Sequence, residues 1–153
     1  MVISTLAPEI QASLLRQWEP INRNQLHYLV TWSPRGRRAA LRERHARALE
    51  AELRSICDAR GIPVLAVCSG PDHVHVLLAL KFTHSVASVV RELKGRTGMS
   101  LMARFPELRV WLRSNLLWDE RYTMEMVGQS RLEPVLARLH ALHGGHEELA
   151  AAG

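Results

Sequence analysis

The amino-acid sequence predicts an α+β domain: an antiparallel sheet with helices on one face, followed by a C-terminal helix. Segments of strand and helix character follow one another in the order strand, helix, strand, strand, helix, strand, helix. The adjacent strands are separated by Ser69-Gly70-Pro71-Asp72, residue types typical of a tight turn. With 153 residues, 47% of them hydrophobic, the chain can form one domain with a substantial core. This order is the split βαβ, or ferredoxin-like, pattern.

The first half of the domain is predicted to contain a strand, a helix and a hairpin. Leu26–Trp32 has strand composition, and Ser33-Pro34-Arg35-Gly36 is a turn sequence. Leu41–Arg60 places its leucines near one helical face, and Gly61-Ile62-Pro63 ends that helix. The two strands of the hairpin are Val64–Cys68 and His73–Leu80.

The second half is predicted to contain a capped helix, a strand and the C-terminal helix. Ser85 can cap a helix whose apolar residues include Val89 and Leu93, and we expect a break near Gly95 or Gly98. Leu116–Val127 supplies the last strand. The terminal helix carries an apolar stripe of Leu132, Val135, Leu136, Leu139 and Leu142.

The chain is expected to divide into three regions. Residues 1–24 form an N-terminal helical extension with a short amphipathic helix at Ile10–Trp18, residues 25–146 the main domain, and residues 147–153 a flexible tail. No basic segment precedes an apolar run at the N-terminus, and no 18-residue apolar segment occurs. Cys57 and Cys68 fit a reduced protein. We therefore expect a cytoplasmic protein with no membrane partner.

Charge favours a polyanionic partner. The net charge of +5 comes with 18 arginines and two lysines, and guanidinium groups suit phosphate oxygens and base stacking. A GC-rich genome also enriches arginine, which accounts for part of this excess. A cluster directly after the first predicted strand is harder to explain by composition; it contains Arg35, Arg37, Arg38, Arg42 and Arg44.

His73 and His75 lie one residue apart at the start of an apolar run. In a strand, both imidazoles face the same way, which is the geometry of a two-histidine metal clamp. The alternative is a half-buried strand that carries two polar residues incidentally. Among the tryptophans, Trp32 and Trp118 fall in apolar strand patterns that indicate core packing. Trp111 has arginines around it, so it is a candidate base-stacking residue.

Further motifs accompany the histidine pair in a fixed order. They are Tyr28-Leu29-Val30-Thr31-Trp32-Ser33-Pro34-Arg35-Gly36-Arg37-Arg38 before it, and Val89-Val90-Arg91-Glu92-Leu93-Lys94-Gly95-Arg96-Thr97, Arg104-Phe105-Pro106-Glu107-Leu108 and Asn115-Leu116-Leu117-Trp118-Asp119-Glu120-Arg121-Tyr122 after it. Together with residues 61–78, they resemble the HUH single-strand DNA transposases of the insertion-sequence 200/605 group. The resemblance runs from about Gln25 to about His143, most of the chain.

The resemblance implies a site, a cofactor and partners. His73 and His75, with one further ligand, would hold Mg²⁺ or Mn²⁺, and a tyrosine of the final helix would attack the scissile phosphate. The implied substrate is single-stranded or hairpin DNA, and the implied assembly is a homodimer. We expect the DNA phosphates to be held by Arg35, Arg37, Arg38, Lys94 and Arg96.

The sequence departs from the family pattern at the nucleophile. The resemblance places tyrosine ten residues after Gly128, where this chain has Arg138, and a glutamine ligand one turn later, where it has Leu142. Arginine stays protonated and cannot attack phosphorus. His140 or His143 could replace the missing ligand; alternatively, the C-terminal histidines only favour the helix dipole.

Three hypotheses follow. The leading one is a transposase-derived protein that binds single-stranded or hairpin DNA and is deficient in tyrosine-dependent cleavage. The second is an active transposase with a relocated nucleophile; the chain has two tyrosines, Tyr28 and Tyr122, and Tyr122 is the candidate. The third is a structural or regulatory dimerisation module whose basic surface is compositional.

Overall fold

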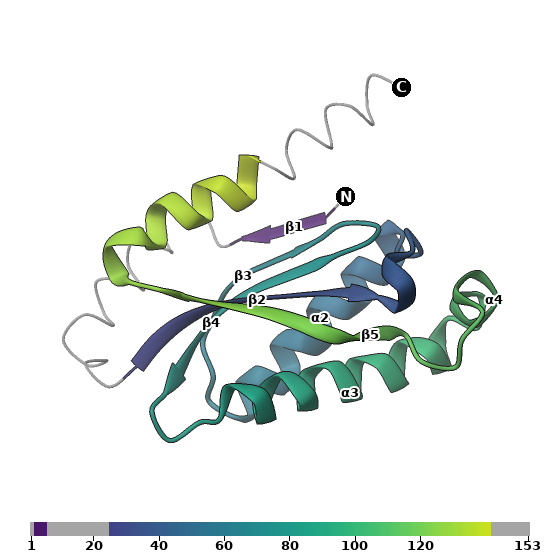
Figure 1. The fold of residues 1–153 in the computed structure, drawn as a ribbon, viewed down its shortest axis with the longest axis horizontal. Helices are drawn as coiled ribbons and strands as arrows, with labels where there is room; N and C mark the ends of the chain where they lie inside the picture. The colour runs from purple at the N-terminus through teal and green to yellow at the C-terminus, as the bar shows by residue number, and fades with distance from the viewer. Residues whose placement is uncertain (1, 6–24, 142–153) are drawn as a thin grey trace.

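The computed structural model of the protein describes residues 2–5 and 25–141. Five strands form one antiparallel sheet in the order β1-β3-β4-β2-β5 (Figure 1). The strands are β1 (Val2–Thr5), β2 (Gln25–Pro34), β3 (Val64–Ser69), β4 (Val74–Lys81) and β5 (Trp118–Val127). The helices are α2 (Glu43–Ala59), α3 (Val86–Arg104), α4 (Glu107–Leu112) and a terminal helix that includes residues 132–141. Apart from β1, this is the split βαβ strand order, which confirms the predicted fold.

β1 is an edge strand that was not predicted. It pairs with β3 from Val2 opposite Ser69 to Thr5 opposite Ala66. Residues 2–5 were assigned to a helical extension, although their β-branched composition suits a strand. The helix predicted at Ile10–Trp18 lies outside the described residues.

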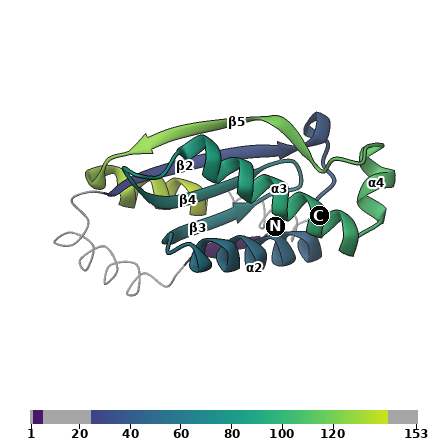
Figure 2. The ribbon, with the colours of Figure 1, turned by 90° about the horizontal axis from the view of Figure 1, so that it is seen from below.

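One face of the sheet packs against α2 and α3, which run side by side (Figure 2). Alternate residues of each strand point to this face, and the core there includes Trp32 and Trp118, whose rings meet edge to face at 5.9 Å. Trp118 Nε1–H donates to Thr97 Oγ1 at 3.0 Å, and that hydroxyl donates to the Leu93 carbonyl at 2.6 Å. The indole of Trp118 is therefore buried with its polar atom satisfied.

The terminal helix covers the opposite face of the sheet. Four residues of its predicted stripe are confirmed, because Leu132, Val135, Leu136 and Leu139 are buried, whereas Leu142 lies outside the described residues. They pack in one cluster with strand residues that alternate with the first core, including Leu29 and Leu77. None of the described helices is long and apolar enough to cross a membrane.

α3 is one continuous helix of 19 residues, so the predicted break near Gly95 or Gly98 was wrong. A Cβ on Gly98 would lie 3.2 Å from Trp118 Cδ1, tighter than ordinary van der Waals contact. Glycine at this position lets the indole of Trp118 approach the helix backbone. Tertiary packing thus overrides the low helix propensity of glycine. The Ser85 cap is confirmed, since its hydroxyl accepts from the Ser88 N–H at 3.3 Å.

Candidate metal site and nucleic-acid interface

Two histidines at the start of β4 lie on the sheet face that the terminal helix covers. The ring centroids of His73 and His75 are 4.9 Å apart. His75 Nδ1 is 2.8 Å from Thr31 Oγ1 on the neighbouring strand, and His73 Nδ1 is 2.9 Å from Asp72 Oδ1. A partner at one ring nitrogen orients the other, which is how metal-ligating histidines are usually held. The predicted same-face geometry of the pair is therefore present.

His75 has an electrostatic environment suited to a neutral ligand. Burial, followed by the nearby His73 and Arg138, lowers the pKa of His75 to about 4. Its imidazole is consequently uncharged at neutral pH, which is the form that coordinates a metal ion.

Gly70 leaves room for the His73 ring. The Gly70 N–H donates to the His73 carbonyl at 2.9 Å and closes the turn, and a Cβ on Gly70 would lie 2.4 Å from His73 Cε1. We expect Gly70→Ala to displace the His73 ring and to lower the affinity of the two imidazoles for Mn²⁺ by about tenfold. This is the smaller effect seen when a metal ligand loses the contact that orients it. Mn²⁺-induced broadening of the histidine ring signals in NMR spectra measures this.

Gly95→Ala is the matched control for that variant. Apart from its chain neighbours and the backbone of its own helix, no atom lies within 4 Å of a Cβ at Gly95, so this change should leave the broadening as in the unmodified protein. Equal broadening in the Gly70 variant would mean that the His73 ring takes no part in binding the ion.

The two imidazoles fit two positions of a metal site, but the site is incomplete. In residues 2–5 and 25–141, no group of three or more His, Cys, Asp or Glu side chains is placed to hold a metal ion. Of the predicted substitutes for the third ligand, His140 is exposed and His143 lies outside the described residues. Two neutral nitrogens alone make a poor site for a hard ion such as Mg²⁺.

Arg138 occupies the terminal helix next to this pair. Its Nη2 lies 3.7 Å from Glu125 Oε2 on β5, and its charge is close enough to lower the pKa of His75. Arg131, seven residues earlier, donates to Glu125 Oε1 at 3.1 Å. Arg131 belongs to the 3₁₀ turn just before the helix, so the Glu125 carboxylate contacts one arginine of that turn and one of the helix. The position that the resemblance assigns to tyrosine thus carries a cation beside the histidines.

Both tyrosines lie on the other face of the sheet. His75 is paired in register with Thr31, whereas Tyr122 is paired with Trp32, the next residue of β2. Successive strand residues point to opposite faces, and Trp32 is in the core under α2 and α3. Tyr28 packs against that same core. The sheet therefore separates each phenol of the chain from the imidazoles.

The arginine-rich turn after β2 lies at the histidine end of the sheet. Arg35–Arg37 form a 3₁₀ turn with Gly36 at φ 67° and Arg37 at φ 57°, and Arg37 and Arg38 are exposed. Leu41 N–H donates to the Pro71 carbonyl at 3.0 Å, which ties the loop to the hairpin turn before His73. The turn and the imidazoles are thus neighbours at one end of the sheet.

Lys94 and Arg96 point to different surroundings. Lys94 Nζ donates to the Asp119 carbonyl at 2.6 Å and lies 5.9 Å from the centre of the Tyr122 ring. Burial lowers the pKa of Lys94. Arg96 instead pairs with Glu92 at 3.6 Å. Two residues apart on a helix is a rotation of about 200°, so the structure does not join the two cations in one site.

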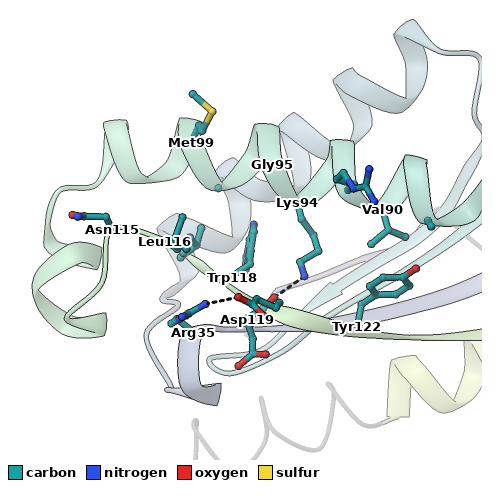
Figure 3. Close-up of a pocket in the computed structure, with 15 residues that line it drawn as sticks. Arg35, Val90, Lys94, Gly95, Met99, Asn115, Leu116, Trp118, Asp119 and Tyr122 are labelled. Atoms are coloured by element: carbon teal, nitrogen blue, oxygen red, sulfur yellow. Dashed lines mark hydrogen bonds and ion pairs between the residues drawn. The ribbon is translucent and has the colours of Figure 1, made fainter.

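Lys94 lines a largely apolar cavity of about 630 Å³ between α3 and β5 (Figure 3). Figure 3 shows Lys94 reaching from α3 toward β5, with the ring of Tyr122 below the helix. Arg35 lies at the other end of the cavity, where it pairs with Glu120 at 3.9 Å. Of the predicted DNA contacts, the structure brings Arg35 and Lys94 to this one cavity, on the face away from His75.

The family can now be assigned by comparison with known proteins. The family model described as "Transposase IS200 like" matches residues 22–138, more than half of the chain. The chain belongs to the IS200-like transposase family. The transposase of insertion element IS200 from Salmonella typhimurium LT2 is 29% identical over 103 residues, 67% of this chain and 68% of that protein. The ISDra2 transposase of Deinococcus radiodurans is 27% identical over 119 residues, 78% of this chain and 85% of that protein.

Solved structures of transposases share the fold of this IS200-like chain. A predicted transposase of Deinococcus radiodurans R1 has a TM-score of 0.63 at 26% identity, over 76% of this chain and 92% of that one. A REP-associated tyrosine transposase bound to a REP hairpin has a TM-score of 0.55 at 16% identity. The match covers 78% of this chain and 68% of that chain. The second likeness is evidence for the fold alone.

Sequence reasoning missed three residues that contact the candidate site residues of this IS200-like chain. Thr31 and Glu125 contact His75 and Arg138 through strand register, which local sequence does not specify. Asp119 binds Lys94 through its main-chain carbonyl, which no side-chain pattern reveals. Alternation along β2 could have placed Thr31 on one face, but not beside a particular histidine.

Proposed function

We propose that this protein is a transposase-derived binder of single-stranded or hairpin DNA that lacks tyrosine-dependent strand cleavage. The observation that carries the proposal is that the imidazoles and the tyrosines lie on opposite faces of the sheet. The imidazoles lie on one face beside Arg138, and both tyrosines of the chain lie on the other. A phosphate held at the imidazoles would meet a guanidinium, which binds anions but is no nucleophile.

The basic turn supports DNA as the partner. Arg37 and Arg38 are exposed at the end of the sheet where the histidines lie, and neither is paired with a carboxylate of the described residues. The REP-associated relative, which shares the fold, is bound to a hairpin. In this proposal Arg35, Arg37, Arg38, Lys94 and Arg96 contact phosphates, although from more than one surface.

A binding measurement tests the proposal. We expect hairpin DNA to bind more tightly than duplex of equal length, and the logarithm of the association constant to fall linearly with the logarithm of salt concentration. Fluorescence anisotropy at several salt concentrations measures both. An affinity that does not change with salt concentration, or no binding at low salt, would favour the alternative of a dimerisation module.

The metal site belongs to the same proposal. Mg²⁺ or Mn²⁺ would be held by His73 and His75, where it would supply positive charge to a phosphate oxygen. Because the described residues offer only these two ligands, we expect binding weaker than micromolar. Micromolar or tighter Mg²⁺ affinity in calorimetry would show that a further ligand completes the site.

We also propose a homodimer that forms through β5. This strand is at the edge of the described sheet, so its outer backbone groups have no strand neighbour among residues 2–5 and 25–141. Met124 and Met126 are 48% and 56% exposed on it, and Leu116 just before it is 58% exposed. An exposed apolar edge favours pairing with a second copy.

Light scattering with size-exclusion chromatography tests the dimer. The unmodified protein should elute at twice the chain mass of 17.3 kDa, and Met124→Glu with Met126→Glu should shift it to the monomer. Phe82→Ser, which removes an exposed apolar residue outside β5, is the control. A dimer that survives the glutamate pair would place the interface elsewhere.

A further inference from the structure

Arginines without a carboxylate partner are concentrated in one part of the described chain. Nine described arginines form ion pairs with carboxylates. Of the seven that do not, Arg91 lies in the middle of α3. The other six fall between residues 37 and 42 or between 104 and 113: Arg37, Arg38, Arg42, Arg104, Arg109 and Arg113. An arginine excess from composition alone would not concentrate the arginines without carboxylate partners in these two segments.

The two segments form one surface at α4. Arg38 Nη1–H donates to the Trp111 carbonyl at 3.4 Å, and Arg44 donates to Glu107 Oε1 at 2.8 Å. His45 is fully buried between α2 and α4. Its Nδ1 accepts from the Arg42 N–H at 2.9 Å, so Nε2 carries the proton and donates to the same Glu107 oxygen at 3.0 Å. Figure 1 shows α4 at the end of the sheet.

Glu107 does not neutralise this surface. Hydrogen bonds, first from Arg44 and then from its own backbone and His45, lower the pKa of Glu107 to about 2. The carboxylate is thus ionised, but both of its charged or polar neighbours already bind it. It therefore acts as an anchor between the helices and leaves Arg38 and Arg42 uncompensated.

Trp111 lies in the middle of these arginines. Its side chain is 39% exposed, and its ring meets the buried His45 ring edge to face at 5.8 Å. The guanidinium carbons of Arg42 and Arg44 lie 5.4 and 5.8 Å from its centre. An indole held by a buried ring, with planar cations over it that can also contact phosphates, is an arrangement on which a base can stack.

A polar cavity of about 550 Å³ adjoins this tryptophan. Leu112, next to Trp111 in sequence, and Arg113, two residues from it, line the cavity together with Arg35 and Arg38. The two carboxylates in the cavity are already engaged, Asp119 by Arg121 and Glu120 by Arg35. Arg38 and Arg113 remain available for an anion, and the volume accommodates a nucleotide.

We propose that Trp111 and its arginines form a separate contact for single-stranded nucleic acid. One unpaired base stacks on the Trp111 indole, and the phosphates beside it bind Arg38 and Arg113. The inference rests on the proposed DNA binding and adds to it a base-stacking site at α4, which shares Arg38 with the basic turn. An acidic peptide would satisfy the arginines but would leave the exposed indole without a stacking partner, so a nucleic acid fits better.

Two oligomers of equal length and charge separate the roles of base and phosphate. We expect the unmodified protein to bind oligothymidine more tightly than an abasic sugar-phosphate chain. Trp111→Leu should weaken oligothymidine binding about tenfold and leave abasic binding unchanged, because stacking on an aromatic ring contributes on this scale. Arg38→Ala with Arg113→Ala should weaken both.

Three controls make the result specific. Trp111→Phe keeps an aromatic face and should restore most of the oligothymidine affinity. Val110→Ala, on the same helix and 73% exposed, should bind as the unmodified protein does. Circular dichroism melting shows that each variant is folded.

The outcomes separate this inference from the proposed function. If hairpin binding is normal but Trp111→Leu discriminates between the oligomers as the unmodified protein does, the stacking site is wrong and the proposed function stands. If polyglutamate competes with oligothymidine at Trp111 better than abasic chain does, the partner is an acidic protein and the inference is also overturned. If the unmodified protein binds neither oligomer nor hairpin, the proposed function fails.

Discussion

Incubated with single-stranded hairpin DNA and Mn²⁺, the unmodified protein should form no covalent adduct, whereas Arg138→Tyr combined with Leu142→Gln should form one. Loss of a nucleophile lowers rates on the order of 10⁶-fold in well-studied enzymes, so the unmodified reaction should be undetectable. Arg138 lies in the helix that covers the imidazoles, beside His75. A phenol at this position would face the phosphate site, and the glutamine would restore the ligand that the resemblance calls for.

The Arg138→Tyr part of the restored variant should leave the protein folded. The Arg138 side chain is 52% exposed and outside the buried stripe of its helix, and its ion pair with Glu125 is a surface pair worth about 0–1 kcal/mol. Denaturing gels with labelled DNA reveal the adduct, and thermal melting reports on folding.

Tyr122→Phe distinguishes loss of chemistry from a moved nucleophile. Because Tyr122 and the imidazoles are on opposite faces, this change should have no effect on the unmodified protein or on the restored variant. An adduct that the unmodified protein forms and Tyr122→Phe abolishes would mean that the nucleophile has moved. The protein would then be an active transposase.

Replacing Arg37 and Arg38 together with alanine should weaken hairpin binding across all DNA sequences. When the logarithm of the association constant is plotted against the logarithm of salt concentration, each phosphate contact contributes about 0.9 to the steepness of the line. Loss of two contacts should therefore reduce the steepness by about 2. The same anisotropy titrations measure it. Phosphate contacts position DNA without reading its sequence, so hairpins of different sequence should lose affinity equally.

Arg54→Ala with Arg60→Ala is the matched control for that variant. It removes the same charge from the far end of α2, where both arginines are paired with carboxylates. The salt slope should stay as in the unmodified protein. An unchanged slope in the Arg37 and Arg38 variant would remove the turn from the DNA site.

The periodicity of apolar residues in the sequence was sufficient to predict most of the helices and strands. Alternating apolar residues predicted β2 and the hairpin, and the same alternation placed His73 and His75 on one face before their rings were seen at 4.9 Å. The stripe of the terminal helix was also readable, because burial follows the helical period. These features depend on neighbours in the chain.

The relations that decide function depend on register and packing instead. That Tyr122 faces away from His75 follows from the pairing of β5 with β2, which no local pattern specifies. The six-residue α4 was not predicted, since a helix this short is stabilised by contacts such as that of Glu107 with His45. Trp111 was a candidate for stacking, but its arginine partners across α2 emerge only in three dimensions.

The buried stripe of the terminal helix makes folding and chemistry separable. Leu132, Val135, Leu136 and Leu139 hold the helix on the sheet, while position 138 contributes to neither core. A mutation there can abolish or restore a reaction without passing through an unstable protein. Under the proposed function, a gene of this kind can persist after it has stopped transposing, because its product remains a stable DNA-binding protein.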